Sequence, residues 1–468
     1  MKKIKAKANI QRNPTRHSRV RGNPEEHHTI ENFRLDPRLL TKGQSPFGRR
    51  GDDTILKQKR NLNIELLFGL FLTFLGFLYF FYIILIHSQF LFKKYNPIQA
   101  EITYSQSQWQ QSQNISPDKV LDEWAIKNGY TGWKNFEDET GNQSESPTSA
   151  KATVGKQKSK ILKDIQNKGV SDSFLYSYVG YKYAHGANPS LLNPEHPPLA
   201  KYLIGYSIRF FGNEHMMGIG VAFLSLLLIG IISYQLSRSI MTASISLFAA
   251  SLFPLFTDQI IHGPQLELYQ LFFFLLVLHF LLMWIKKKKM IFCICAGVFF
   301  GMLLSTKTVV PFFLLFGAWL TFSFWKQWKT LIIIIGIGTL IFIATYYQFF
   351  LLGGALRSFL GLQKYIVTYY GNAHIPLLEF AGNYLRLIYT GSWKFWDSSR
   401  TISHYSEWNL LWPLIFSWGM WQLRSRWNKN NGYRMLIIFI ILYNLFVFIT
   451  PIFPRYLLLL FVPLVILL

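Results

Sequence analysis

Asn188-Pro-Ser-Leu-Leu-Asn-Pro-Glu-His-Pro-Pro-Leu-Ala-Lys201 is the stretch of sequence that decides the fold. It holds four prolines, an acid, an imidazole and a lysine, and it lies between strongly apolar segments. Because proline fixes φ and has no backbone N–H, residues 188–196 are predicted to form neither a helix nor a paired strand. The fixed φ of Pro197 and Pro198 suits the first turn of a helix. The stretch therefore predicts a rigid bend that leads directly into a helix.

The residues after this bend divide between two faces of a helix. Glu195 and His196 lie at its N-terminus, where free amides and the helix dipole favour negative charge. Taken alone, both residues would simply start and cap the helix. We expect an amphipathic helix along a membrane surface. Its apolar face consists of Leu199, Tyr202, Leu203, Tyr206 and Phe210, and its second face of Lys201, Gly205 and Arg209.

The composition is that of a polytopic membrane protein. Half of the 468 residues are hydrophobic and only 15% are charged, too few for an ordinary soluble domain. The net charge of +24 comes mostly from the N-terminal tail and short loops, as the positive-inside rule requires, so we expect no nucleic-acid partner. Cys293 and Cys295 lie in an apolar run and are interpreted as packing residues.

Apolar runs and basic loops together predict the topology. The clusters at 286–289 and 326–329 mark cytoplasmic loops, which leaves the acid-bearing segments outside. We expect an all-α protein of about ten transmembrane helices. Its predicted parts are a disordered basic cytoplasmic tail over 1–63, which contacts membrane lipids, a first transmembrane helix over 64–87, a first external loop over 88–215 with a catalytic segment at 171–213, transmembrane helices 2–7 over 216–352, a second large external loop over 353–408 and transmembrane helices 8–10 over 409–468.

Pro194-Glu-His-Pro-Pro-Leu-Ala-Lys201, which follows a Tyr-rich, Gly-ended segment, resembles the first luminal loop of the protein O-mannosyltransferases. It is similar also to the aminoarabinose transferases that modify lipid A. The resemblance implies a GT-C bundle with amphipathic surface helices in the first external loop. It implies an inverting glycosyltransferase of the plasma membrane, which moves a mannose-like sugar from a polyprenyl-phosphate donor to an extracytoplasmic protein, lipid or glycan acceptor.

Asp172 is the leading candidate for the catalytic base. Ser171 is a good helix N-cap and Gly186 a good helix stop, so a helix is predicted between them. An Asp in its first turn could simply stabilise the positive end of the helix dipole. The resemblance implies instead that this Asp is the base. An insertion at 89–170 separates it from the first span, unlike in most of the family, so three further acids remain as rivals: Asp122, Glu123 and Asp164.

Two more acids are candidates. Glu267, in His262-Gly-Pro-Gln-Leu-Glu267, lies at the mouth of a span, where a charge usually faces a wet cavity. The resemblance implies a catalytic role for it, with Asp258 as the alternative. Glu195 corresponds to a metal ligand of the lipid A branch, which implies a divalent metal cation. His196 is interpreted as an acceptor-site or a structural residue.

Three cations are predicted to bind the donor phosphate: Lys201 on the surface helix, Lys307 and Arg455. A departing lipid phosphate develops negative charge that cations stabilise. Gly301…Thr306-Lys307 and Pro454-Arg455-Tyr456-Leu457 resemble segments of the family. Long basic side chains at span edges can also snorkel to the interface.

The second external loop carries two candidate histidines. His404-Tyr-Ser-Glu-Trp408 and Tyr369-Tyr-Gly-Asn-Ala-His374 resemble family segments, although their aromatic residues could equally form an interfacial belt. His374 is predicted as a metal ligand and His404 as an acceptor or structural residue.

Two other classes of function compete with this interpretation. A polyprenyl-lipid transporter or flippase would need polar and cationic residues inside several spans, whereas here the ionisable groups gather at external mouths. An inactive structural protein of the envelope would bind no donor. The sequence contains no Gly-rich phosphate loop, which suits a lipid-linked donor.

Overall fold

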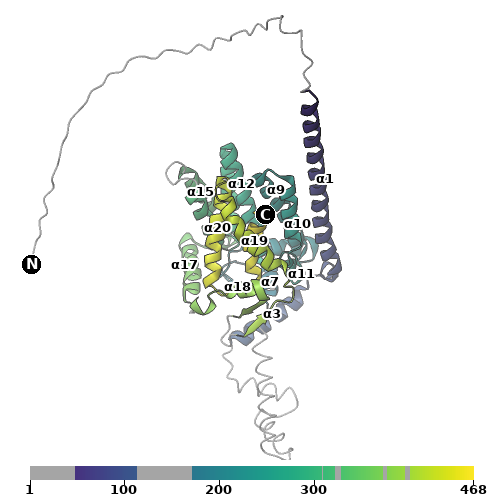
Figure 1. The fold of residues 1–468 in the computed structure, drawn as a ribbon. Coiled ribbons are helices and arrows are strands. Elements are labelled where there is room, and N and C mark those ends of the chain that lie inside the picture. Colours follow the sequence, from purple (N-terminus) through teal and green to yellow (C-terminus); the bar gives the residue numbers. More distant parts are fainter. Residues whose placement is uncertain (1–47, 113–170, 308, 322–327, 373–376, 396–400) are drawn as a thin grey trace, which may run out of the picture. The chain divides into compact units, whose positions relative to one another are not determined.

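The computed structural model describes residues 48–112, 171–307, 309–321, 328–372, 377–395 and 401–468 (Figure 1). The chain divides into two units, Met1–Lys59 and Arg60–Leu468, and the site lies in the second. Helix α1 (Gly48–Ile86) begins earlier than the predicted start at residue 64, and its membrane-grade part is Asn63–Ile86. The rivals Asp122, Glu123 and Asp164, and also His374, lie outside the described residues.

The described part of the predicted first external loop contains four short helices. They are α2 (Gln89–Phe92), α3 (Pro97–Ser112), α7 (Asp172–Ala184) and α8 (Leu199–Phe211). The predicted ends of α7 are confirmed: the Ser171 side chain accepts a hydrogen bond from the Phe174 backbone N–H, and Gly186 has a φ of 93°. The bend before α8 is irregular, as proline chemistry predicts.

Helix α8 differs from its prediction in one respect. The face that carries Lys201 and Gly205 is buried against α7, and Phe210 of the predicted apolar face is exposed. Gly180 and Gly205 explain the difference, because two glycines opposite each other let the helix backbones touch. The contact brings the start of α8 and its preceding bend against α7.

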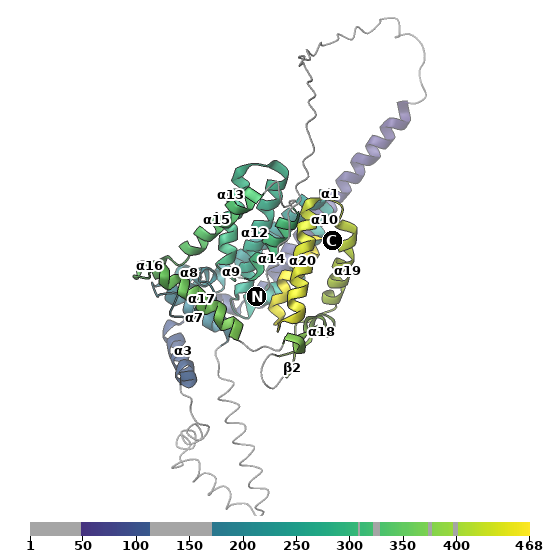
Figure 2. The same ribbon diagram turned by 90° about the vertical axis from the view of Figure 1, so that its left-hand side faces the viewer.

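The transmembrane bundle is built around α12. It packs against α9, α13, α20 and α21, while α13 also packs on α15 and α14 on α20 (Figure 2). Its helices are α9 (Met216–Ser237), α10 (Ile240–Ser251), α11 (Pro254–Ile261), α12 (Leu266–Lys287), α13 (Met290–Leu304), α14 (Val309–Thr321), α15 (Trp328–Ala344), α19 (Leu411–Arg426), α20 (Asn431–Ile449) and α21 (Leu458–Ile466), with the 3₁₀ turn η3 (Pro454–Leu457) before α21.

Four of the described helices are long and apolar enough to cross a membrane, and α10 with α11 makes a fifth if this pair, bent by 47°, is one span. These helices describe a multi-pass membrane protein. Four shorter apolar helices accompany them, at Met290–Leu304, Val310–Thr321, Trp328–Ala344 and Pro454–Ile466. A total of about ten spans stays a prediction.

The predicted second external loop, 353–408, contains more structure than expected. Its elements are α17 (Leu356–Asn372), η2 (Leu377–Phe380), α18 (Asn383–Thr390), β1 (Ser392–Lys394) and β2 (Ile402–His404), and α16 (Tyr347–Leu351) precedes it. The strands pair antiparallel with Trp393 opposite Ser403, a hairpin that the all-α expectation missed. Both ribbon views place α7, α18 and this hairpin at the same end of the bundle, away from the α12–α13 turn (Figures 1 and 2).

Candidate functional site

Four ionisable side chains from four distant parts of the sequence form one chain of contacts, which we call the charge cluster: Asp172, Arg455, Glu267 and Lys307. Arg455 Nη2 donates to Asp172 Oδ2, and Arg455 Nε donates to Glu267 Oε1 at 3.2 Å. Lys307 Nζ donates to the same Glu267 oxygen at 2.5 Å. The structure thus brings together both predicted catalytic acids and two of the three predicted phosphate-binding cations.

Each member of the cluster lies at the end of an element. Asp172 is the first residue of α7, and Glu267 lies in the first turn of α12. Lys307 follows the turn that ends α13, and Arg455 follows the proline that opens η3. Element ends expose backbone and side chains to the bundle rim, so four separate segments can converge there without placing a charge at the bilayer centre.

The two acids lie in different environments. The Glu267 side chain is only 2% exposed and contacts both cations, whereas the Asp172 side chain is 46% exposed and, among the described residues, is paired with the Arg455 cation. Glu267 Oε2 is buried and has no hydrogen-bond partner among the described residues. The cluster therefore leads from a buried anchor at Glu267 to an open carboxylate at Asp172.

Aromatic rings surround the cations. The Arg455 guanidinium lies 4.7 Å from the Phe453 ring centroid, and Lys307 Nζ lies 4.6 Å from that of Tyr456. Tyr176 of α7 is buried beside the cluster: burial, and then the negative charges of Asp172 and Glu267, raise its pKa well above the usual value. These rings hold the cations in place and restrict the water around them. Tyr176 was not among the predicted site residues.

His196 contributes a neutral imidazole to this region. Its ring lies 6.2 Å from that of Tyr176. Burial lowers its pKa well below the usual value, and the positive charges of Lys307, Lys201 and Arg455 lower it further. A neutral ring among cations can donate or accept one hydrogen bond without adding charge.

Lys201 has structural contacts. It is fully buried, and its Nζ donates to the backbone oxygens of Asn193 at 2.5 Å and His196 at 2.9 Å. Burial lowers its pKa to about 7, against the opposing effect of Glu195. Lys201 thus fastens the bend to α8 and positions His196, and its predicted contact with donor phosphate stays a prediction.

The described residues do not fit the expected divalent metal. No group of three His, Cys, Asp or Glu side chains lies together in the part of the chain that the structure describes. Asp172 and Glu267 are already paired with cations. The negative charge of Glu195 raises the pKa of the Tyr104 phenol, after burial, and opposes the lowering of the Lys201 pKa.

The remaining candidates lie on the second external loop and on α11. His404 ends β2, and its Nδ1 lies 3.2 Å from the Ser392 hydroxyl across the hairpin, a structural contact. Asp258, the alternative to Glu267, shares a hydrogen bond of 2.5 Å with His262 Nδ1. His262 was not among the predicted site residues, although the spacing of an Asp and a His four residues apart on a helix indicates that their side chains can meet.

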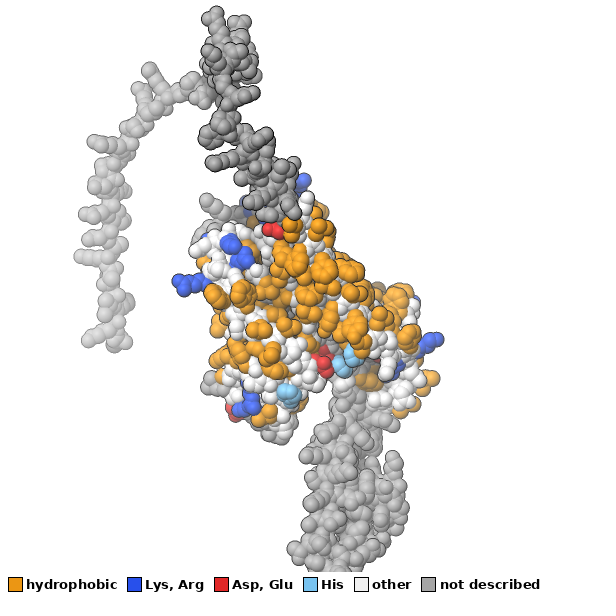
Figure 3. Space-filling model, turned by 45° about the vertical axis from the view of Figure 1, so that its right-hand side comes forward, with side chains coloured by type: hydrophobic (Ala, Val, Ile, Leu, Met, Phe, Trp, Pro, Cys, Tyr) orange, Lys and Arg blue, Asp and Glu red, His pale blue; other side chains and the backbone are white. Residues whose placement is uncertain are grey.

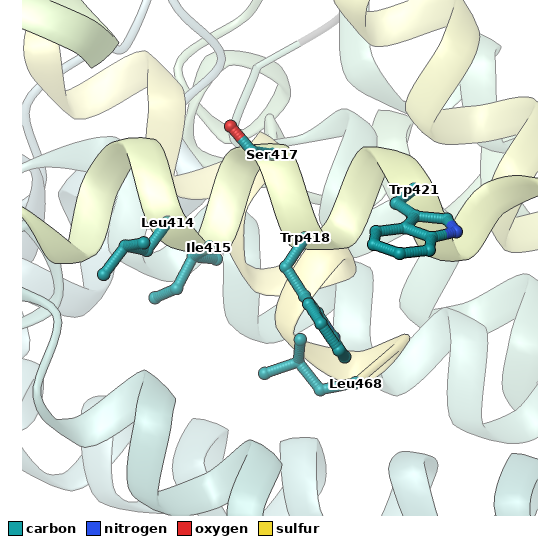
Figure 4. Close-up of a pocket in the computed structure, with 6 residues that line it drawn as sticks. All are labelled: Leu414, Ile415, Ser417, Trp418, Trp421 and Leu468. Atoms are coloured by element: carbon teal, nitrogen blue, oxygen red, sulfur yellow. The ribbon is translucent and has the colours of Figure 1, made fainter.

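The two apolar hollows of the surface lie elsewhere. One, of about 430 Å³, is lined by α19 and by Leu468 (Figure 4), and a second, of about 550 Å³, lies between α14 and α15. Apolar side chains also cover much of the middle of the face in Figure 3, as lipid contact requires.

No protein-family model and no curated protein matches this chain. Among solved structures, it is similar to ArnT from Cupriavidus metallidurans in the apo state, with 19% identity and a TM-score of 0.46 over 64% of this chain and 54% of that one. ArnT bound to undecaprenyl phosphate gives 15% identity, a TM-score of 0.44 and coverage of 64% and 55%. The Archaeoglobus fulgidus oligosaccharyltransferase in complex with Zn and sulfate gives 12% identity and a TM-score of 0.36, over 63% of this chain and 43% of that one. The chain spans about half the length of both ArnT chains.

Proposed function

We propose that the protein is a membrane glycosyltransferase of the GT-C type. It moves a mannose-like sugar from a polyprenyl phosphate to an extracytoplasmic acceptor with inversion at the anomeric carbon. The observation that carries the proposal is the charge cluster, in which an open carboxylate lies next to two partly exposed cations at one end of a membrane bundle. A transporter would need such groups along the length of its spans.

Arg455 and Lys307 bind the donor phosphate. A guanidinium has five N–H donors, and the contacts of Arg455 with Asp172 and Glu267 use only Nη2 and Nε, so further donors remain for a phosphate. Glu267 holds both cations in fixed positions, which is the preorganisation that charge stabilisation in a transition state requires. Neutral His196 adds a hydrogen bond without repelling the phosphate or the two cations.

Asp172 is the base. An acceptor hydroxyl attacks the anomeric carbon, its proton passes to Asp172, and the bond between that carbon and the phosphate oxygen breaks with its electron pair leaving on the phosphate. A phosphate on Arg455 competes with Asp172 for the guanidinium, so donor binding releases the carboxylate for the acceptor. A positioned base contributes about 10²–10⁴-fold to the rate.

The side of the membrane follows from the lysine-rich turn. The turn that joins α12 to α13, with Lys286–Lys289, lies away from the bundle end that carries α7 (Figures 1 and 2). The positive-inside rule favours the cytoplasm for that turn, which supports our placing the charge cluster on the extracytoplasmic side of the plasma membrane.

Asp172→Asn tests the proposal. Purified protein is incubated with undecaprenyl-phosphate mannose, glucose and aminoarabinose, and the release of free undecaprenyl phosphate is measured. We expect kcat to fall at least about 100-fold while undecaprenyl phosphate still binds. Glu407→Gln, at an exposed acid of the second loop, is the matched control and should keep its activity. Undiminished turnover by Asp172→Asn would reject the assignment.

A further inference from the structure

The loop after α11 touches the helix turn that carries Asp172. Gly263 has a φ of 126°, and a Cβ placed on it would lie 2.6 Å from Cβ of Ser173. His262 and Asp172 are the immediate chain neighbours of these two residues. With consecutive Cα atoms 3.8 Å apart, the Cα atoms of His262 and Asp172 are within about 13 Å of each other. The loop therefore lies against the first turn of α7, next to Asp172 in sequence.

His262, at the start of this loop, and Asp258 of α11 form a dyad. His262 Nδ1 lies 2.5 Å from Asp258 Oδ1, and the His262 backbone N–H donates to the Asp258 backbone oxygen at 3.0 Å. The His262 side chain is 65% exposed and that of Asp258 only 23%. The carboxylate fixes Nδ1 as the donor, so in the neutral ring Nε2 is an acceptor. An open acceptor on a fixed ring is suited to a ligand hydroxyl.

Tyr405 of the second external loop lies beside this dyad. Its ring packs 5.3 Å from Trp412, which packs 5.2 Å from Phe253 at the start of α11. Burial, and then the Asp258 charge and a hydrogen bond with Asp258, raise the pKa of the Tyr405 phenol. Trp412 Nε1 is buried and has no hydrogen-bond partner among the described residues. A buried donor without a partner is costly, so it points to a polar ligand.

We propose that Asp258, His262 and Tyr405 form the subsite for the acceptor, and that the acceptor is a carbohydrate. The inference rests on the proposed function. Several polar groups close together suit a ligand with neighbouring hydroxyls, whereas a serine or threonine side chain offers only one. His262 Nε2 and Tyr405 Oη bind hydroxyls next to the attacking one, whose proton passes to Asp172.

The test separates acceptor from donor. Undecaprenyl-phosphate mannose serves as the donor, and three acceptor probes are compared: a mannose disaccharide, dodecyl maltoside and a threonine-rich peptide. The KM for each acceptor is measured beside the Kd of undecaprenyl phosphate. His262→Ala should raise the KM for a sugar acceptor about tenfold, the effect of about one lost hydrogen bond, and leave that Kd unchanged. The two sugar probes distinguish a soluble glycan from a lipid-borne one.

Three further variants sharpen the result. His262→Gln keeps a hydrogen-bond acceptor and should recover part of the loss, and Tyr405→Phe should raise the acceptor KM in the same way. His185→Ala is the matched control, because His185 is exposed and its Nδ1 is also hydrogen-bonded, to the Tyr181 backbone oxygen at 2.7 Å. It should leave every constant unchanged.

An unchanged acceptor KM in His262→Ala, or a weakened Kd for undecaprenyl phosphate, overturns the inference and leaves the proposed function standing. Preference of the wild-type protein for the peptide over both sugars overturns the carbohydrate acceptor. A wild-type protein that neither binds undecaprenyl phosphate nor consumes the donor overturns the proposed function, and this inference falls with it.

Discussion

Gly205→Ala tests how α7 and α8 hold the site. A Cβ at position 205 would lie 1.9 Å from the backbone oxygen of Gly180 and 3.0 Å from Cβ of Ala184. Close contacts between carbon and a carbonyl oxygen are about 3.3 Å, so the two helices must move apart by about 1.4 Å. The first of these atoms belongs to the backbone and cannot rotate away.

The cost follows from two opposing effects. Overpacking destabilises by about 1–3 kcal/mol, and alanine recovers about 1 kcal/mol of helix propensity, so the net loss is at most about 2 kcal/mol. The effect on activity is larger, because α7 begins at Asp172 and the bend before α8 carries His196. A displacement of about 1 Å at a reacting group can lower the rate about 100-fold.

Turnover of the undecaprenyl-phosphate sugar and thermal unfolding in detergent measure the two effects separately. We expect kcat to fall about 100-fold with a modest decrease in Tm. Gly220→Ala on α9 is the control, because a Cβ there has no atom within 4 Å among the described neighbours. If Gly205→Ala keeps both wild-type kcat and wild-type Tm, α7 and α8 are not in backbone contact at Gly180, and the positioning argument fails.

Arg455→Gln should weaken binding of undecaprenyl phosphate, and it should lower the free energy of unfolding by about 3–5 kcal/mol because it leaves Glu267 with one cation fewer. Adding Glu267→Gln should restore part of the Tm. If the double variant restores none of it, Arg455 and Glu267 are not paired. Burial lowers the pKa of Lys201 to about 7, so the unfolded chain binds more protons than the folded protein from pH 7 up to the ordinary lysine pKa, and stability should rise with pH over that window. Melting curves between pH 7 and 10 should show that Tm rises less with pH in Lys201→Met than in the wild-type protein. The pKa of His196 is also lowered, so stability should fall as the pH drops below the ordinary histidine value, and His196→Gln should weaken that fall.

The ends of local elements could be predicted because their signals are local. Ser171 and Gly186 bound α7 by the chemistry of their own side chains and backbone, and the prolines of the bend exclude regular structure whatever surrounds them. The apolar runs of the long spans are likewise readable from composition. These features depend on neighbours in sequence, so one sequence suffices.

The packing of α8 and the hairpin could not be predicted in this way. Lys201 and Gly205 indicated a polar face, yet the touching glycines turn that face inward, and nothing in the sequence pairs Gly180 with Gly205. Strands β1 and β2 are three residues each, too short for an alternating pattern to stand out. Both features depend on contacts between separate segments.

The roles of the two acids also depend on such contacts. Both Asp172 and Glu267 were predicted to be catalytic, because the resemblance to the glycosyltransferase family implied that role for each. Arg455 lies 283 positions after Asp172 and 188 after Glu267, and it contacts both. A carboxylate that is 2% exposed and shared between two cations is held too firmly to accept a proton from an incoming hydroxyl, whereas one that is 46% exposed and has a single partner can exchange that partner for the acceptor. In the proposed function, burial therefore gives the two acids different roles: Glu267 fixes the cations that bind the leaving phosphate, and Asp172 acts as the base.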